Sequence, residues 1–231
     1  MHACRGVSAC VGGRALSELL IKTVASYLLG SLVGGLLVGR LRGGVDIRTL
    51  GSGNAGGTNA LRTQGKGFAF WVLLIDIGKG WLATAVVAPM VFPGVPVAAE
   101  DLRVWAPAAC GIAAIIGHIY PVWYGFRGGK GVATLLGTVL GLEPLLLVPM
   151  LLTWLAAVGL VGFVGLASML AAASLPVFVT VADVEPAAPL LSFGALVTLM
   201  VVFTHRSNIA RMRTGTEPRA RRLWLFGRNG R

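Results

Sequence analysis

Charged residues are scarce in this chain of 231 residues. They make up 13% of the sequence, whereas 55% of the residues are apolar and the mean hydropathy is +0.79. An average soluble domain carries about 25% charged residues. The shortage of charge therefore excludes an ordinary water-soluble domain, and the apolar content excludes a disordered chain.

Cysteine and the common hydrolase signatures are also rare or missing. The chain has three cysteines, Cys4, Cys10 and Cys110, and their odd number and spacing fit neither a disulfide framework nor a zinc site. It has no G-x-S-x-G elbow, no H-E-x-x-H motif and no Cys/His cluster. These absences argue against a serine hydrolase and against a zinc enzyme.

Long apolar segments dominate what is there. A membrane span needs about 20 apolar residues, so this length fits one compact bundle of about seven spans. Glu143-Pro144 separates the fourth segment from the fifth, because the residue before a proline is disfavoured in a helix. The predicted segments are 17–38, 68–92, 105–125, 132–142, 145–162, 166–182 and 189–204.

The net charge of +11 is concentrated in three places. Segment 39–67, segment 126–131 and the tail after Phe203 hold 15 of the 20 basic residues, whereas the intervening loops are acidic. The positive-inside rule then predicts that these three regions are cytoplasmic, so the charge reflects membrane topology rather than nucleic-acid binding. We expect an all-α, polytopic membrane bundle of about seven helices, with the N-terminus outside and the C-terminus cytoplasmic.

The chain shows no internal repeat and no low-complexity linker, which predicts a single membrane domain. We assign residues 17–217 to a seven-span domain and residues 218–231 to a basic cytoplasmic tail. Residues 1–16 form an N-terminal extension for which we also allow disorder. No A-x-A-like cleavage site follows the first apolar segment, so we expect that segment to be retained as a span.

Three polar clusters lie on the predicted cytoplasmic side. The first, residues 51–66, combines glycines with short hydrogen-bonding side chains and two cations, Arg62 and Lys66. Such a segment suits an anion because glycine allows close backbone approach, although a flexible solvated turn explains the composition about as well. Its candidate binding residues are Ser52, Gly53, Asn54, Thr58, Asn59, Arg62 and Lys66.

The second cluster is a glycine loop, Gly128-Gly129-Lys130-Gly131, that opens an apolar helix. Amides and helix dipole both favour an anion at such a position. A basic anchor on a tight turn is an equally good explanation. The loop is not a nucleotide P-loop, because Tyr124 and Gly131 stand where that motif needs Gly and Ser or Thr.

The third cluster begins at His205, directly after the last apolar segment. On a continuing helix, His205, Asn208 and Arg211 share one face. His205 suits acid–base chemistry or donation to a phosphate, while a basic tail against anionic lipid is the alternative.

Two ionisable residues, Asp76 and Lys79, lie inside the second apolar segment. Charges at membrane depth are costly and usually face the bundle interior, so the pair serves either as a site wall or as an internal ion pair. In the third apolar segment, His118 is more simply an interior histidine than a ligand. Few carboxylates lie on the cytoplasmic side, which argues against a Mg²⁺ site. From the residues alone, an organic-phosphate transporter and an enzyme acting on phosphorylated ligands fit equally well.

The clusters closely resemble those of the bacterial acyl-phosphate-dependent glycerol-3-phosphate acyltransferases. The resemblance runs in order from about residue 25 to 217 and covers most of the chain. The matching residues are Tyr27–Ser31, Asp46–Arg48, Gly51–Asn54, Thr58, Asn59, Arg62, Asp76, Lys79, Gly80, Gly128–Thr134, His205, Arg206, Asn208, Ile209, Arg211, Gly215 and Glu217.

The resemblance implies a multi-pass enzyme of a bacterial cytoplasmic membrane, with its site facing the cytoplasm and without cofactor or metal. It would transfer a fatty acyl group from acyl-phosphate to the 1-hydroxyl of glycerol-3-phosphate, giving lysophosphatidate and phosphate, the first step of phospholipid synthesis. Expected partners are these substrates, membrane lipid and an upstream enzyme that forms acyl-phosphate. The organic-phosphate transporter remains the alternative.

The resemblance also assigns roles to individual residues. Ser52, Arg62, His205 and Asn208 would be catalytic, the loop Gly128–Gly131 would bind glycerol-3-phosphate, and Glu217 would be structural. Together with the clusters described above, the expected substrate-binding residues are Gly53, Asn54, Thr58, Asn59, Lys66, Asp76, Lys79, Gly128, Gly129, Lys130, Gly131 and Ser168. Two positions depart from the family pattern: Gly57 replaces a usual alanine, and Gly165 replaces a usual serine.

Overall fold

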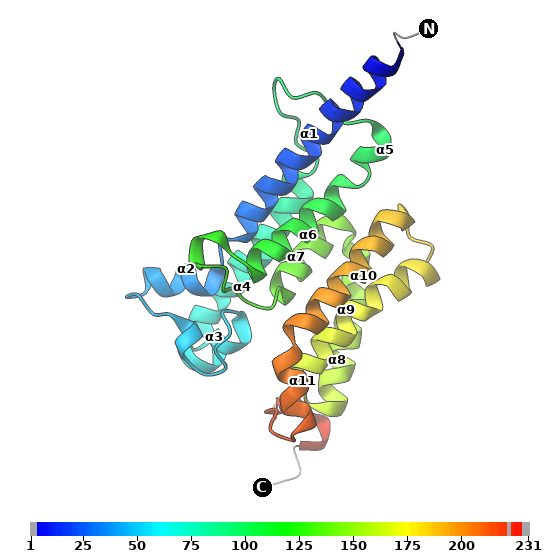
Figure 1. Cartoon of the computed structure of the whole chain (residues 1–231). Coiled ribbons are helices and arrows are strands. Elements are labelled where there is room, and N and C mark those ends of the chain that lie inside the picture. The colour runs from blue at the N-terminus through cyan, green and yellow to red at the C-terminus, as the bar shows by residue number, and fades with distance from the viewer. Residues whose placement is uncertain (1–3, 221–222, 228–231) are drawn as a thin grey trace. The chain divides into compact units, whose positions relative to one another are not determined.

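The computed structural model describes residues 4–220 and 223–227, and all regular elements in this part of the chain are helices (Figure 1). The expectation of an all-α fold is confirmed. The α-helices are α1 (Cys4–Gly30), α2 (Gly34–Leu41), α3 (Gly57–Gln64), α4 (Lys66–Trp81), α5 (Glu100–Arg103), α6 (Ala106–Ile119), α7 (Val132–Leu142), α8 (Leu147–Val161), α9 (Val164–Val181), α10 (Ala187–Thr204) and α11 (Arg206–Arg213). A π-helical turn, Leu82–Val87, extends α4, and short 3₁₀ turns lie at Ile47–Thr49, Val122–Tyr124, Pro144–Leu146 and Leu225–Gly227.

Five helical stretches of the described residues are long and apolar enough to cross a membrane. A sixth candidate is the pair Leu16–Gly30 and Gly34–Leu41, which bends by 48° at its break. Helix α7 is apolar but shorter, as predicted for 132–142. The five stretches are Lys66–Val87, Glu100–Tyr124, Pro144–Val161, Val164–Val181 and Ala187–Thr204.

The surfaces of these helices carry large apolar side chains that a soluble protein would bury. Phe70 of α4 is 59% exposed, Val177 of α9 is 62% exposed and Leu199 of α10 is 67% exposed. Exposed large apolar side chains on long apolar helices indicate contact with another apolar phase. These helices therefore suit a lipid environment.

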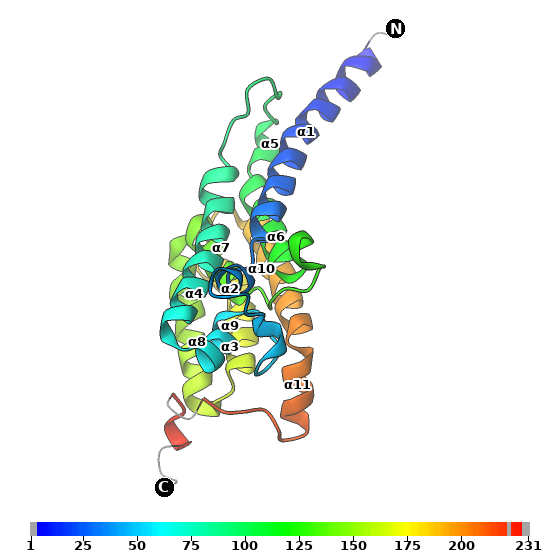
Figure 2. The same cartoon turned by 90° about the vertical axis from the view of Figure 1, so that its left-hand side faces the viewer.

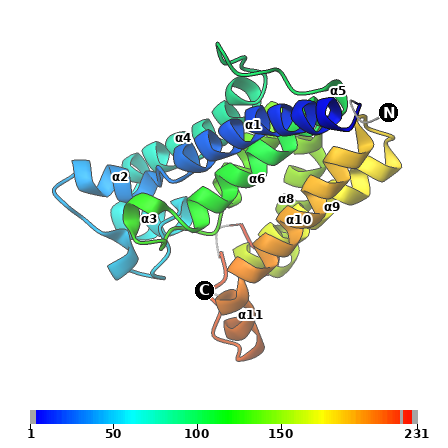
Figure 3. The same cartoon turned by 45° about the horizontal axis from the view of Figure 1, so that its top comes forward.

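The chain divides into two compact units, which are described separately. The first comprises Met1–Gly129 and Ala133–Leu142, and the second comprises Lys130–Val132 and Glu143–Arg231. In the first unit α1 lies along α6 (Figures 2 and 3). A Cβ on Gly30 of α1 would collide with the backbone of Ala114, and a Cβ on Gly117 of α6 would collide with the carbonyl of Tyr27. Glycine lets these two backbones touch, which is how membrane helices replace the hydrophobic effect with close packing.

Helix α7 packs against α4 in the same way. A Cβ on Gly137 would overlap the backbone of Ile77, and a Cβ on Gly80 would overlap the carbonyl of Thr134. The hydroxyl of Thr84 also donates to the carbonyl of Thr138 at 3.3 Å. The short apolar helix thus belongs to the interior of the first unit.

In the second unit α9 packs against both α8 and α10. Helix α10 ends at His205, whose φ of −94° and ψ of 10° separate it from α11. The segment after α11 returns to the α8–α9 turn, where the Ala220 amide donates to the Gly162 carbonyl at 2.8 Å. The Arg219 guanidinium lies over the rings of Phe163 and Trp224. Part of the segment predicted as a tail is therefore docked on its own unit.

Candidate functional site

One asparagine organises the glycine-rich segment of the first unit. The Asn59 side-chain amide donates to the carbonyls of Ile47, Leu50 and Asn54 at 2.9, 3.0 and 3.0 Å. Its Oδ1 accepts the Ser52 amide at 2.9 Å. Asn59 is 1% exposed, so its side-chain donors and acceptor are used for hydrogen bonds that shape the segment. The sequence predicts Asn59 as a substrate-binding residue, which stays a prediction, and in the structure its side chain holds the backbone that presents Ser52.

The residues around Asn59 remain open to solvent. Ser52, Gly53 and Thr58 are exposed and Asn54 is half-buried. Arg62, in the last turn of α3, and Lys66, at the start of α4, are also exposed. The segment is therefore a braced loop beside two accessible cations, rather than a freely flexible turn.

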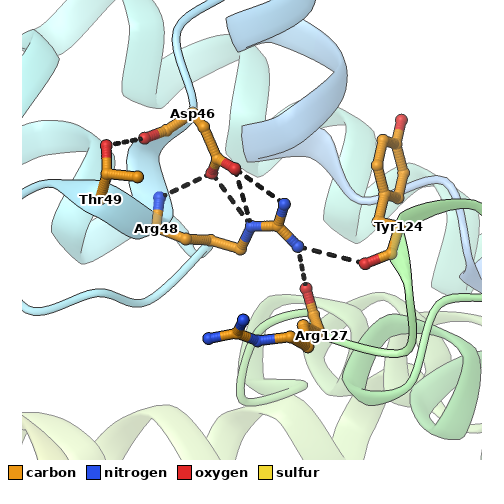
Figure 4. A network of polar contacts seen from close by, with 5 residues as sticks. All are labelled: Asp46, Arg48, Thr49, Tyr124 and Arg127. Atoms are coloured by element: carbon orange, nitrogen blue, oxygen red, sulfur yellow. Dashed lines mark hydrogen bonds and ion pairs between the residues drawn. The ribbon is translucent and has the colours of Figure 1, made fainter.

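Arg48 joins this segment to the loop after α6 (Figure 4). Its guanidinium contacts the Asp46 carboxylate at 2.7 Å and donates to the carbonyls of Tyr124 and Arg127 at 3.2 and 2.8 Å. Hydrogen bonding from Arg48 holds the pKa of Asp46 below its usual range, and the same contact raises the pKa of Arg48. The Asp-Ile-Arg motif belongs to the resemblance, but Arg48 was not among our candidate site residues. The only signal available was its place directly before the glycine-rich segment.

Asp76 and Lys79 form a buried group with His118. Lys79 Nζ lies 2.9 Å from Asp76 Oδ1, 2.9 Å from His118 Nδ1 and 3.0 Å from the Leu32 carbonyl. Asp76 Oδ1 also accepts the Gly34 amide at 2.9 Å. The side chains of Asp76, Lys79 and His118 are 0%, 3% and 2% exposed. Both ionic residues are thus turned to interior partners, which favours the ion-pair alternative over a site wall.

The first two residues of the glycine loop are hydrogen-bonded to the C-terminal end of α6. The amides of Gly128 and Gly129 each donate at 3.1 Å, to the carbonyls of Ile119 and His118 respectively. A Cβ on Gly128 would overlap the His118 carbonyl, and a Cβ on Gly129 would overlap the imidazole. These two amides are therefore committed to carbonyls of α6.

Lys130 belongs to the second unit, where it donates to Asn208 Oδ1. Asn208 in turn donates to Glu217 Oε1 at 2.6 Å, and Glu217 Oε2 accepts from Arg211 at 2.6 Å. Burial, followed by the positive charge of Arg211, lowers the pKa of Lys130 to about 8. The chain Lys130–Asn208–Glu217–Arg211 is therefore a connected polar network that supports a partly desolvated cation. Glu217 accepts from both Asn208 and Arg211 in this network, and its structural role stays a prediction.

His205 lies directly after the last candidate span and is 4% exposed. Its Nδ1 is 2.8 Å from the Val201 carbonyl, and because a carbonyl only accepts, Nδ1 carries the proton and Nε2 carries the lone pair. Burial, followed by the charge of Lys130, lowers the pKa of His205 to about 4. The imidazole is therefore neutral at pH 7, with its lone pair on Nε2.

Two further expected site residues have local structural roles. Gly131 has a φ of 84°, a left-handed conformation that glycine tolerates before α7. Ser168 donates to the Val164 carbonyl at 2.9 Å and accepts from Trp154 at 3.4 Å. Near it, a Cβ on Gly165 would lie 2.9 Å from Asn208 Nδ2, so the glycine that replaces a usual serine gives Asn208 its space.

Within residues 4–220 and 223–227, no three His, Cys, Asp or Glu side chains gather in a way that could hold a metal ion. The expected site residues fall into two groups. The first unit holds Ser52, Gly53, Asn54, Thr58, Asn59, Arg62, Lys66, Asp76, Lys79, Gly128 and Gly129, and the second holds Lys130, Gly131, Ser168, His205, Asn208 and Glu217.

Comparison with known proteins adds a family to this geometry. Residues 20–215 match the family model described as glycerol-3-phosphate acyltransferase. The glycerol-3-phosphate acyltransferase of Synechococcus sp. (strain CC9902) is 42% identical over 204 residues, which cover 88% of this chain and 96% of that protein. The protein of the same description from Geobacter sulfurreducens (strain ATCC 51573 / DSM 12127 / PCA) is 40% identical over 204 residues, covering 88% and 98%.

Two solved structures are also similar. Both are of PlsY (YgiH), described as an integral membrane glycerol 3-phosphate acyltransferase. Its glycerol 3-phosphate form has a TM-score of 0.76 and 34% identity, and its lysophosphatidic acid form has a TM-score of 0.74 and 33% identity. Each match covers 87% of this chain and 94% of the other.

Proposed function

This chain belongs to the glycerol-3-phosphate acyltransferase family, and we propose that it uses acyl-phosphate as the donor. It transfers the acyl group to the 1-hydroxyl of glycerol-3-phosphate and releases lysophosphatidate and phosphate. The acceptor and the membrane setting follow from the family and from the apolar helices. The similar structures carry glycerol 3-phosphate and lysophosphatidic acid, which supports the proposed acceptor and product.

The observation that carries the proposal is the pairing of a desolvated cation with a neutral histidine in the second unit. Lys130 is positioned by Asn208, and the buried His205 presents an unprotonated Nε2 at neutral pH. A phosphorylated alcohol needs a cation for its phosphate and a base for its hydroxyl. This pairing provides both kinds of group.

The reaction itself needs little acid assistance. The hydroxyl oxygen of glycerol-3-phosphate forms the new ester bond to the acyl carbon, the bond from that carbon to the phosphate oxygen breaks, and inorganic phosphate leaves. The hydroxyl proton passes to a base. We propose His205 Nε2 for this role, and a phosphate oxygen of the substrate is the alternative.

The larger energetic problem is the repulsion between two phosphate groups. Two unit charges 4 Å apart repel by about 4 kcal/mol even at an effective dielectric of about 20. We propose that three cations of the polar clusters, Arg62, Lys66 and Lys130, each help to offset this repulsion. Ser52, exposed on the loop that Asn59 braces, then orients a substrate oxygen.

The finer membrane arrangement is also part of the proposal. We propose seven spans within residues 17–217, an outside N-terminus, and a C-terminus and active site that face the cytoplasm of a bacterium. The basis is the concentration of basic residues in three regions, together with five span-length apolar stretches, the bent pair Leu16–Gly30 and Gly34–Leu41, and the shorter apolar helix α7. An enzyme that forms acyl-phosphate would supply the donor from the same side.

The test uses purified full-length protein in lipid. We expect phosphate release that requires both acyl-phosphate and glycerol-3-phosphate, without metal or nucleotide, and lysophosphatidate as the product. Arg62→Ala should abolish this release, and acyl-CoA should not replace acyl-phosphate. Activity with acyl-CoA alone would overturn the proposed donor. Binding of glycerol-3-phosphate without transfer from either donor would instead favour an organic-phosphate transporter.

A further inference from the structure

The imidazole of His118 lies directly under the glycine loop. If Gly129 carried a Cβ, that atom would overlap His118 Nε2, and it would lie 3.1 and 3.3 Å from Cε1 and Cδ2. The edge of the ring thus occupies the place of the missing side chain. The Gly129 amide also donates to the His118 carbonyl at 3.1 Å, so this residue contacts the loop through both backbone and side chain.

Lys79 determines which edge of the imidazole faces Gly129. A lysine ammonium has three protons and no lone pair. Three acceptors surround Nζ: Asp76 Oδ1 at 2.9 Å, the Leu32 carbonyl at 3.0 Å and His118 Nδ1 at 2.9 Å. His118 Nδ1 also lies 3.3 Å from Asp76 Oδ1, a longer contact that a proton on Nδ1 would serve. Because the ammonium at 2.9 Å can only donate, we assign the lone pair to Nδ1 and the proton of the neutral ring to Nε2. The edge that meets Gly129 is an N–H rather than a lone pair.

The proton on Nε2 matters for an anion-binding loop. An N–H edge presents partial positive charge, whereas a lone pair would repel a nearby phosphate. Asp76, which is 0% exposed, accepts from both Lys79 and the Gly34 amide, and thereby fixes the ammonium in place. Asp76, Lys79 and His118 thus form a chain of polar contacts that ends at the glycine loop.

We propose that His118 is a positioning residue for glycerol-3-phosphate binding, with Lys79 and Asp76 setting its tautomer. This inference rests on the proposed function, because it assumes that the glycine loop binds the phosphate of the acceptor. It also changes the role of Asp76 and Lys79 from substrate contacts to supports of the loop. His118 shapes the Gly128–Gly129 backbone, from which Lys130 follows directly in the chain.

The first experiment compares three variants by kinetics and by calorimetric binding of glycerol-3-phosphate. His118→Phe keeps a ring but removes both nitrogens, and it should raise KM and Kd for glycerol-3-phosphate about tenfold or more with kcat within about threefold. His118→Gln carries an acceptor for Lys79 and a donor for the loop, and it should restore most of the affinity. Thr138→Val is the control, because Thr138 is a buried polar residue of the same unit whose hydroxyl donates only to the Leu135 carbonyl.

The second experiment is a suppressor test that does not depend on the stability of His118→Phe. Gly129→Ala places a methyl group against Nε2 and should raise KM in the same way. His118→Ala removes the ring, so the double variant should bind glycerol-3-phosphate better than Gly129→Ala alone. If the losses of affinity in the two single variants simply add in the double variant, His118 only supports packing. The same conclusion follows if every His118 variant has a lower melting temperature but an unchanged KM.

Failure of the proposed function gives a different pattern from failure of this inference. If wild-type protein binds glycerol-3-phosphate by calorimetry but transfers no acyl group, the enzymatic proposal fails, and the His118 variants still test the loop through Kd. If wild-type protein is active and the His118 variants keep their Kd, the positioning role is wrong and the activity stands.

Discussion

At the scale of single residues, the cation of the glycine loop is the most informative group. Lys130 is partly desolvated and its neighbour Arg211 is positive, so the pKa of Lys130 falls to about 8. The ammonium form binds an anion and the neutral amine does not. Anion binding should therefore be intact below pH 8 and weaken as the pH rises above it.

We expect kcat/KM for glycerol-3-phosphate to fall above about pH 8 in the wild-type protein. A phosphate monoester is already a dianion there, since its second pKa is about 6, so the fall would report the protein. Lys130→Arg keeps its charge at every accessible pH and should flatten the alkaline fall, although it need not restore full activity. The measurement is a pH series from 7 to about 9.5 on both proteins. An identical fall in Lys130→Arg would assign the titration to another group.

The second prediction at this scale concerns His205. Burial keeps its pKa near about 4, so Nε2 is unprotonated across the neutral range. If Nε2 takes the hydroxyl proton, His205→Gln should lower kcat by about 10² or more and remove the limb of the pH profile near pH 4, whereas the limb near pH 6 that the substrate phosphate causes should stay. A loss of only a few-fold, with an unchanged profile, would identify a phosphate oxygen of the substrate as the base. Arg206→Gln, an exposed change at the next position, is the matched control.

At the scale of elements, the loop that presents Ser52 depends on one buried side chain. Asn59→Ala would leave the carbonyls that its amide satisfies without that partner, at a cost of about 1–3 kcal/mol for each buried group left unpaired. We expect activity to fall more than tenfold, while the helices of the same unit stay folded by circular dichroism. Thr49→Ala removes an exposed hydroxyl that donates to the Asp46 carbonyl at 2.8 Å, and it should change activity little. Equal effects of the two substitutions would contradict the bracing role.

The packing of α7 on α4 gives a prediction about stability. Gly137→Ala would place a Cβ into the backbone of Ile77, so the two helices must separate, at a cost of about 1–3 kcal/mol. Gly78 of α4 meets nothing within 4 Å of its added Cβ, and Gly78→Ala should be neutral or stabilising by up to about 1 kcal/mol. Thermal unfolding in detergent compares the two directly. A Gly137→Ala protein as stable as Gly78→Ala would refute the close contact.

At the scale of the whole molecule, the distribution of basic residues predicts the orientation of the protein in the membrane. The basic loops predict a cytoplasmic segment 39–67 and a cytoplasmic C-terminus, with Glu100, at the start of α5, on the outside. Single cysteines test this arrangement in a background in which the native cysteines are serine. Glu100→Cys should react with a membrane-impermeant maleimide in intact cells, whereas Arg42→Cys and Arg213→Cys should react only after permeabilisation. Labelling of Arg42→Cys in intact cells would reverse the proposed topology.

The sequence alone was sufficient for the helical class, the apolar segments and the family. Hydropathy is a property of each stretch of chain. The apolar segments around α4, α8, α9 and α10 can therefore be predicted without knowing which helices they pack against. The family is equally local, because its motifs are short runs such as Gly128–Thr134. The order of these motifs along the chain is sufficient to indicate the acyltransferase family, without the three-dimensional structure.

Only the tertiary structure decided which polar side chains serve which group. The side chain of Asn59 holds three backbone carbonyls, and Asp76 and Lys79 contact His118 of another helix. Arg48 connects two segments because its guanidinium donates to backbone carbonyls that lie 76 and 79 residues away in the sequence. A hydrogen-bond partner depends on the path of the chain in space, and residue type and spacing do not encode that path. The sequence therefore determined which chemistry is available, while the fold determined which residues support it and which remain exposed to a ligand.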